Sequence, residues 1–336
     1  MAIYTSTLKS DGTGDYSSLA AWMSSENDNG RIAGHDHTLE IYSGTYTENF
    51  YKYISYSSGG NLTLRGMETD RADTVIDGNF YLRAPNTLVE HLTFVNTQSA
   101  SAVLSSDGIM SYTVKDCHVE ATQSDCLTLK CSPWFGNGVV VQVYDTTIIS
   151  TVTTGSKRLA NALGGVYFEN CKFQSSIKHD TYYGIYSDSN SHTNDQNVFN
   201  RCWIDSCLAT RDISVDTECN SCYLTGDISG EQLDSVLTLN NCVINLDTGA
   251  LGHKYSSKTD GSYTNTLQVN NCVWLSASRI DVSWWSLFTL DVGPSYVNSF
   301  LQSDLNHYND YHTDGYSWGT AASLTTPSDW QDGNWI

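Results

Sequence analysis

The sequence is poor in basic residues and lacks any long apolar run. Only 17 of the 336 residues are Lys or Arg, against 37 Asp and Glu, so the formal net charge is −20. No basic cluster is present, and binding to phosphates requires clustered Lys and Arg. No stretch approaches the 18 or so consecutive apolar residues of a membrane-spanning helix. These absences exclude nucleic acid as a partner and predict that the chain does not insert into a membrane.

The first ten residues also lack a secretory signal. They have no basic start, no apolar stretch and no cleavage site of small residues. We therefore expect that a signal has been removed, or that the protein leaves its cell by another route. One such route is assembly into a virus particle that is released by lysis.

Glutamate is scarce beside aspartate, with 9 Glu against 28 Asp. Glu favours helix interiors, whereas Asp favours turns and helix caps. The chain also contains 25 Gly, 21 Tyr and 9 Trp, and it is 40% hydrophobic and only 16% charged. This composition excludes a disordered chain and a mostly helical one, and it predicts strands joined by many turns.

A short pattern repeats along the chain: an apolar strand, a polar corner residue, a cysteine, any residue and an apolar residue. Its copies are spaced by 20 to 31 residues, with a mean of about 26. That length fits one coil of a parallel β-helix, whereas leucine-rich repeats would show Leu at fixed offsets and a helix in each repeat. About ten coils, at about 4.8 Å each, make a rod about 50 Å long. The clear copies contain Cys117, Cys171, Cys202, Cys242 and Cys272, and weaker copies contain Leu92, Thr146 and Cys222.

The corner before the cysteine is Asn or Asp in most copies, at Asn170, Asn241, Asn271, Asp116 and Asp145. These side chains tolerate the left-handed backbone that a sharp bend requires. We therefore expect each coil to bend at this position.

The two ends of the sequence differ from the repeat. Residues 17–25 are amphipathic and predict a short helix, capped by Asp15 or Ser17, that covers the open end of the solenoid. Residues 286–336 predict a C-terminal cap or interaction segment, after a β-helix over 31–285 and an N-terminal strand and helix over 1–30, all within one structural domain. The aromatic residues gathered near the C-terminus are Trp284, Trp285, Phe288, Trp318, Trp330 and Trp335.

Three segments carry a family resemblance. The opening from Asp11 to Leu19, the stretch Thr74–Gly78 and the stretch Val89–Asn96 resemble the pectin-lyase-like right-handed parallel β-helix superfamily. The resemblance covers about residues 4–280, and it implies an all-β fold, a single elongated domain with three sheets. The opening is also similar to that of β-helix proteins carried by tailed phages, and this second resemblance implies a trimer, although no heptad or trimerisation tail is visible.

Six of the ten cysteines fall on the repeat position, where Leu92 and Thr146 also fit, so we expect a stacked internal row of small side chains. Two alternatives stay open. One is a zinc site formed by Cys202, Cys207, Cys219 and Cys222, and the other is a disulfide that joins Cys126 to Cys131 or Cys207 to Cys219.

The superfamily's enzymes use Asp with Arg or Lys, often with calcium, but their sequence patterns are absent here. Three groupings place a basic residue beside another charged residue: Lys157 with Arg158, Lys178 with Asp180, and Arg211 with Asp212. We interpret these residues as solvated residues of turns or of ladders between coils. His179 and the run from Asp304 to Gly315 offer a weaker acid-base or calcium alternative. We therefore assign no catalytic, cofactor-binding or metal-binding residue and expect no cofactor, with calcium as the alternative.

Two groups of tyrosines are candidates for exposed aromatic surface. Such side chains stack on sugars or form contacts between chains, although strand packing explains many of them. The first group is Tyr42, Tyr46, Tyr51, Tyr53 and Tyr56, and the second is Tyr182, Tyr183 and Tyr186.

These observations predict a non-enzymatic structural protein on the virion surface of a tailed phage, acting as a capsid decoration, a fibre or a receptor-binding spike. The expected partners are other virion proteins, further copies of the chain and a cell-surface glycan used for host attachment. The alternative is an extracellular polysaccharide lyase or glycan hydrolase, including a tailspike depolymerase. A third option is a non-catalytic glycan-binding or adhesion module.

Overall fold

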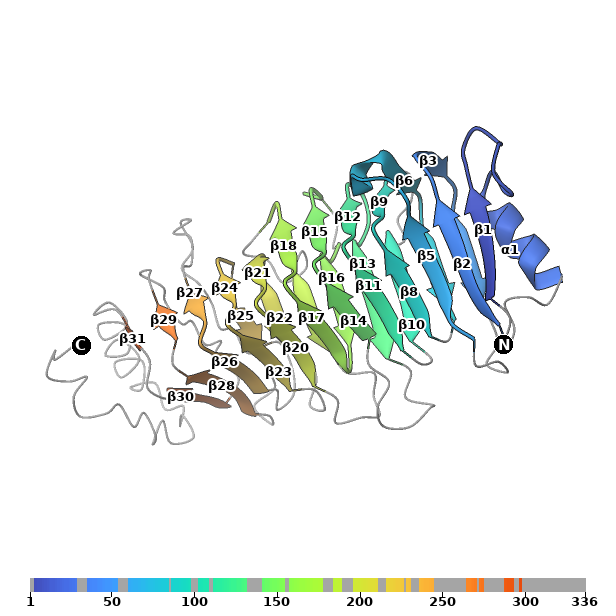
Figure 1. Cartoon of the computed structure of the whole chain (residues 1–336). Helices are drawn as coiled ribbons and strands as arrows, with labels where there is room; N and C mark the ends of the chain where they lie inside the picture. Colours follow the sequence, from blue (N-terminus) through green and yellow to red (C-terminus); the bar gives the residue numbers. More distant parts are fainter. Residues whose placement is uncertain are drawn as a thin grey trace, which may run out of the picture.

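The computed structural model describes residues 3–28, 35–53, 60–84, 86–97, 102–108, 111–131, 141–154, 157–177, 184–188, 196–210, 216–226, 228–230, 236–244, 264–270, 272–274, 287–292 and 296–297. The chain passes in turn through three sheets, A, B and C, and every strand pairs in parallel with the equivalent strand of the next coil. Figure 1 shows the stacked coils running from the N-terminal helix along an elongated body. The fold is a right-handed parallel β-helix, as the repeat and the resemblance predicted.

Sheet A contains the strands that precede the bend. In spatial order they are β1 (Ile3–Leu8), β2 (Asp36–Ile41), β5 (Leu62–Gly66), β8 (Thr87–Glu90), β11 (Tyr112–Lys115), β14 (Val141–Tyr144), β17 (Val166–Glu169), β20 (Asn197–Asn200), β23 (Thr217–Asn220), β26 (Val236–Asn240), β28 (Thr264–Asn270) and β30 (Leu287–Val292).

Sheet B follows the bend. Its strands are β3 (Gly44–Thr47), β6 (Thr74–Asp77), β9 (Thr93–Asn96), β12 (His118–Ala121), β15 (Thr147–Ser150), β18 (Lys172–Ser175), β21 (Trp203–Asp205), β24 (Tyr223–Leu224), β27 (Val243–Ile244), β29 (Val273–Trp274) and β31 (Tyr296–Val297).

Sheet C closes each coil. Its strands are β4 (Phe50–Tyr53), β7 (Phe80–Arg83), β10 (Leu104–Gly108), β13 (Leu127–Cys131), β16 (Ala160–Leu163), β19 (Ile185–Asp188), β22 (Leu208–Thr210) and β25 (Ile228–Gly230).

The core is built from rows of side chains that repeat at the same place in successive coils. Side chains alternate between the two faces of a strand, so every second residue points inward. In sheet A one such row is fully buried and includes stacked aromatic rings, because Phe168 and Phe199 lie 4.8 Å apart at 9°. The row runs through Leu39, Leu64, Val89, Val114, Val143, Phe168, Phe199, Cys219 and Leu239.

The bend between sheets A and B uses the predicted left-handed residues. Asp116, Asp145, Asn170 and Asn241 have φ between 49° and 55°, which confirms the prediction for these four positions. His91, Arg201 and Ser221 adopt the same conformation at the equivalent position of their coils, with φ of 54–58°. Asn271 lies outside the described residues. The repeat therefore fixes the backbone of this corner even where the side chain has no intrinsic preference for it.

Helix α1 (Leu19–Asp28) lies beside β1 at the N-terminal end of the stack (Figure 1). It buries Leu19, Trp22 and Met23 in the same core as the first coils. The predicted caps were wrong, because the Asp15 carboxylate instead accepts hydrogen bonds from Thr7, and Ser18 Oγ accepts from Ala21 N at 3.0 Å. That the helix closes the solenoid stays a prediction.

The remaining features concern the segment boundaries and the number of coils. A short 3₁₀ helix, η1 (Arg71–Asp73), lies between β5 and β6. The predicted division at residues 30 and 285 and the count of about ten coils stay predictions; β30 and β31, after residue 285, still pair with sheets A and B. No helix in the described part of the chain has the length and hydrophobicity needed to cross a membrane.

Candidate functional site

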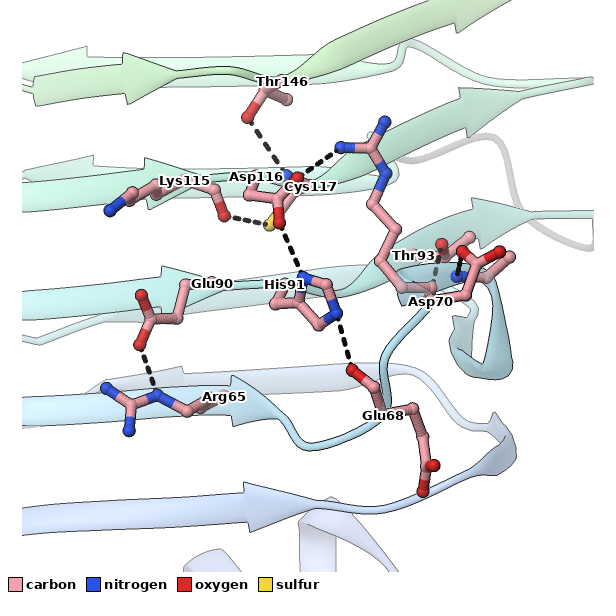
Figure 2. A network of polar contacts seen from close by, with 12 residues as sticks. Arg65, Glu68, Asp70, Glu90, His91, Thr93, Lys115, Asp116, Cys117 and Thr146 are labelled. Atoms are coloured by element: carbon pink, nitrogen blue, oxygen red, sulfur yellow. Dashed lines mark hydrogen bonds and ion pairs between the residues drawn. The ribbon is translucent and has the colours of Figure 1, made fainter.

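A cluster of charged side chains lies at the bend between sheets A and B, and we call it the corner network. Figure 2 shows His91 and Asp116, the corner residues of two successive coils, pointing toward each other. His91 Nδ1 lies 2.6 Å from Asp116 Oδ2, and Arg71 donates from a guanidinium nitrogen to Asp116 Oδ1 at 2.8 Å. His91 Nε2 lies 2.8 Å from the carbonyl oxygen of Glu68. The network therefore ties the segment that contains Arg71 to two coils.

The two contacts of His91 define its protonation state. A carboxylate and a carbonyl oxygen only accept hydrogen bonds, so both ring nitrogens must donate and the ring is an imidazolium. The hydrogen bond to Asp116, followed by that to the Glu68 carbonyl, raises the pKa of His91 against the opposing effects of burial and of Arg71. With both nitrogens committed, His91 is not available as a general base. The network is an anchor for the backbone, not an acid-base pair.

The corner network predicts a stability that depends on pH. A raised folded-state pKa means that the contribution of His91 is fully present below its unfolded pKa of about 6.5 and is lost as the pH rises through the folded-state pKa. Its charged neighbours are Asp116 and Arg71, and His91 is 27% exposed. We therefore expect the free energy of unfolding to fall by about 0.5–1 kcal/mol as His91 loses its proton. Urea unfolding of the wild type and of His91→Asn between pH 6 and pH 9 measures the difference.

Asparagine is the matched replacement for His91, because it occupies the same corner at Asn170 and Asn241 with the same positive φ. Subtracting the two pH profiles cancels the titration of the other histidines. A difference that stays constant across the pH range would contradict the imidazolium assignment.

Charged side chains on the outer face of sheet A pair with one another across coils. Arg65 Nε donates to Glu90 Oε1 at 2.5 Å (Figure 2), and Arg201 pairs with Glu169. Toward the C-terminal end the same outward row becomes an amide ladder, in which Asn270 donates to Asn240 and Asn240 to Asn220, each at 3.0 Å. These outward polar groups are thus used between neighbouring coils.

Arg158 is the predicted basic residue that the structure places in a cluster, on the outer face of sheet C. Its guanidinium carbon lies 3.8 Å from the centre of the Tyr186 ring, and it donates to Asn161 Oδ1 at 2.6 Å. Its backbone N–H donates to Asp125 Oδ1 at 2.6 Å, and Asn161 Nδ2 donates to Thr128 Oγ1 at 3.3 Å. We call these five residues the Arg158 cluster. It combines a cation, a carboxylate and amide and hydroxyl groups, which are the components of a polar ligand site.

Tyrosines also lie on the outer face of sheet C. Tyr51 and Tyr81 stack with ring centres 4.5 Å apart at 10°, and Tyr51 is 71% exposed. The prediction of exposed tyrosines is therefore confirmed for Tyr51, but it was wrong for Tyr46 and Tyr186, which are buried. Tyr46 points inward because it occupies the inward-facing position of β3, where its hydroxyl lies within hydrogen-bond distance of the carbonyl oxygens of Leu8 and Tyr42. Tyr186 is covered by Arg158.

Several predicted site residues lie outside the described residues. This group contains Lys178 and Arg211 with their acidic neighbours, the histidine that was considered for acid-base chemistry, the run that was considered for calcium binding and most of the C-terminal aromatic residues. Its members are Tyr56, Lys178, His179, Asp180, Tyr182, Tyr183, Arg211, Asp212, residues 304–315, Trp284, Trp285, Trp318, Trp330 and Trp335.

The six cysteines at the repeat position lie in the stacked internal row that the repeat predicted. Nine of the ten cysteines, including Cys126, Cys207 and Cys219, are buried free thiols. The disulfide alternatives were therefore wrong for Cys126 and for Cys207 with Cys219. Among the described residues no group of three or more His, Cys, Asp or Glu side chains could hold a metal ion, so the four cysteines of the zinc alternative do not form such a site.

A buried polar cluster beneath α1 was missed by the sequence analysis. Trp22 Nε1, which can only donate, lies 3.3 Å from His37 Nε2, so Nε2 accepts and the proton is on Nδ1. That nitrogen lies 3.6 Å from a Glu26 carboxylate oxygen, and Ser6 Oγ lies 3.3 Å from Nε2. The order Ser, His, Glu is that of a hydrolase triad. All three residues are buried, however, and the Trp22 indole occupies the nitrogen that would activate the serine.

The signals that could have found these clusters differ. His91 and Asp116 each precede the repeat position of their coil, so aligning the repeats places them side by side. The contact of Arg158 with Tyr186 has no such signal, because sheet C carries no recurring motif.

The chain shares its fold with known β-helix proteins. Carrot pectin methylesterase is 15% identical over 85% of this chain and 87% of its own, with a TM-score of 0.47. The rice weevil pectin methylesterase is 13% identical over 70% and 76%, with a TM-score of 0.42. A tailspike protein of the Acinetobacter baumannii bacteriophage Fri1, described as a capsular polysaccharide depolymerase, is 11% identical over 88% and 63%, with a TM-score of 0.45.

At these identities the likeness concerns the fold alone, and that fold is the parallel β-helix that the sheet topology of the chain itself shows. No protein-family model matches the chain, and no curated protein matches it by sequence. The function must therefore be argued from the chain's own residues.

Proposed function

We propose that the chain is a non-enzymatic structural protein of a tailed-phage particle, in which the β-helix serves as a stiff rod for decoration, as a fibre or as a receptor-binding spike on the virion surface. The observation that carries this proposal is the set of nine free thiols buried in the core. Free cysteines in such number are typical of proteins that fold in a reducing compartment, whereas secreted proteins usually form disulfides. A phage protein folds in the bacterial cytoplasm and is released by lysis.

The use of the charged side chains supports the non-enzymatic part of the proposal. In the corner network the histidine is fixed as an imidazolium, and on sheet A the charges that we describe pair across coils. Paired ladders of this kind stiffen a rod and leave its faces free to contact other virion proteins or further copies of the chain. Assembly as a trimer remains part of the proposal.

A second candidate, a glycan-binding or glycan-cleaving protein, is favoured by the outer face of sheet C. The exposed Tyr51–Tyr81 stack and the Arg158 cluster lie on the same sheet. Aromatic faces and polar groups on one surface suit a sugar chain. This candidate differs from the first in requiring a ligand.

An assay on polysaccharides separates the candidates. We expect the purified chain, incubated with uronate-containing and host-derived polysaccharides, to form unsaturated products and reducing ends no faster than a heat-denatured sample. Arg158→Ala and the control Lys115→Ala, on the outer face of sheet A, should behave alike. Turnover that falls at least tenfold in Arg158→Ala, but not in Lys115→Ala, would overturn the non-enzymatic proposal. Retention of a glycan that Tyr51→Ala abolishes, without turnover, would favour the glycan-binding candidate.

A further inference from the structure

Five consecutive coils carry a cysteine at the same internal position, directly after the bend. We call Cys171, Cys202, Cys222, Cys242 and Cys272 the cysteine ladder; each is at most 2% exposed. The coils are in register here, because the carbonyl oxygens of Cys171, Cys202 and Cys222 each accept, at 2.9 Å, the N–H of the residue that follows the next cysteine. On the N-terminal side Thr146 ends the ladder, and Cys117 stands alone between Leu92 and Thr146.

The thiols of the ladder all point the same way. Each Sγ donates to the carbonyl oxygen two residues earlier at 3.3–3.5 Å. Each also contacts a carbonyl oxygen of sheet A in the preceding coil at 3.2–3.7 Å. Because the orientation repeats, neighbouring sulfur atoms are separated by about the spacing of the coils, which is about 4.8 Å.

This spacing matches a particular kind of metal site. A bond between a metal ion and a thiolate is about 2.3 Å long, so two thiolates on opposite sides of one ion lie about 4.6 Å apart. Zinc requires four ligands, and no group of three or more metal-binding side chains exists among the described residues. Soft thiolates select ions of the copper(I) class. The ladder therefore fits a two-coordinate ion and not a tetrahedral one.

We propose that pairs of neighbouring thiols in the cysteine ladder bind a soft monovalent ion, copper(I) or silver(I), in linear two-coordinate geometry. Each ion replaces two thiol protons, which are released, and the bound unit of two thiolates and one ion carries a single negative charge. The five thiols accommodate two such ions, because two separate pairs use four of them.

The surroundings of the ladder suit that charge. The N–H of Cys202 lies 3.4 Å from Cys222 Sγ and that of Cys242 lies 3.3 Å from Cys272 Sγ, so backbone donors already point at the sulfur atoms. Hydrogen bonds from these backbone N–H groups stabilise the negative charge that remains on the bound pair of thiolates.

Serine replacements test the proposal by position. Serine fits the ladder, because the Thr146 hydroxyl occupies the equivalent position, donates to the Tyr144 carbonyl oxygen at 2.8 Å and accepts from Cys117 N. All proteins in the comparison carry Cys219→Ala, which removes the thiol next to Cys222 and Cys242. Reduced, oxygen-free full-length protein is titrated with silver(I) and with copper(I). The readouts are the ultraviolet charge-transfer band and the protons released per ion.

The expected stoichiometry depends on which ladder thiol is lost. The parent protein should bind two ions beyond the contribution of the remaining thiols, with two protons released per ion. Cys222→Ser keeps two pairs and should still bind two; Cys202→Ser isolates Cys171 and should bind one. The double variant Cys202→Ser/Cys242→Ser leaves only isolated thiols and should bind none. Cys117→Ser, outside the ladder, should bind two.

Equal losses in Cys202→Ser and Cys222→Ser would overturn the proposal, since they would show binding that depends only on the number of thiols. Binding that appears only after unfolding in urea, or no binding, would overturn it as well. Circular dichroism and thermal unfolding before titration show whether each variant is folded. If Cys202→Ser does not fold, Cys242→Ser replaces it and should bind one ion. If Cys222→Ser does not fold, Cys272→Ser replaces it and should bind two ions.

Discussion

Replacing Trp22 by alanine is expected to lower the free energy of unfolding by about 3–5 kcal/mol, the usual cost of deleting a large buried aromatic side chain. Trp22 is fully buried in the core that α1 shares with the first coils, and its indole donates to His37 Nε2 at 3.3 Å. The truncation leaves a cavity and removes the donor from a buried histidine. Urea unfolding measures the loss, and hydrogen exchange should show it first in β1 and β2.

The control for Trp22 is Ser24→Ala, on the exposed side of the same helix. We expect it to change the stability by no more than about 0.5 kcal/mol. If Trp22→Ala remained within about 1 kcal/mol of the wild type, the predicted closing role of α1 would be wrong, because the helix could then be loosened at little cost to the first coils.

Phe168→Ala is expected to have an effect of similar size, about 3–5 kcal/mol, at the middle of the rod. The Phe168 ring stacks on Phe199 of the next coil at 4.8 Å and meets the edge of Phe173 at 5.2 Å. In a solenoid each coil contacts only its neighbours, so the damage should remain local. Hydrogen exchange should show the largest loss of protection in β17 and β20, with little change in β1 and β2.

Tyr167→Ala provides the matched control, since Tyr167 is the adjacent aromatic residue and points out of the sheet. Its hydroxyl contacts Glu169 and Asn200, and both contacts lie on the surface side of sheet A. We expect a cost of about 1 kcal/mol or less. If the two substitutions had equal effects, the inner row of sheet A would not provide the main stabilising contacts of these coils.

The conformation of the bend was predictable from local chemistry. Asn170 and Asn241 tolerate a left-handed backbone, and the structure gives them φ of 53° and 55°. Thr146 was placed in the cysteine row by spacing alone, and its hydroxyl bonds to the backbone as the cysteines do. Both predictions succeeded because every coil repeats the same backbone geometry at the bend, so the residue preference seen in one coil applies to the equivalent residue of the others.

The composition of the outer clusters was not predictable from the sequence. Arg158 was singled out for its charge beside Lys157, yet its contacts are with Tyr186 and Asn161 on separate strands of sheet C. Tyr186 was expected to be exposed and is buried beneath the guanidinium. The connections from sheet B to sheet C differ in length from coil to coil, so the sequence does not fix which side chains meet there.

The β-helix, its coil length, the left-handed bend and the internal row of cysteines are predictable from the amino-acid sequence, because these features follow from residue preferences that recur in every coil. The polar contacts between coils are not predictable in this way: His91 is held as an imidazolium between Asp116 and the Glu68 carbonyl, and Ser6, Glu26 and His37 meet beneath α1. Those contacts join residues 11 to 31 positions apart. Their geometry depends on how the coils stack, which no single segment encodes.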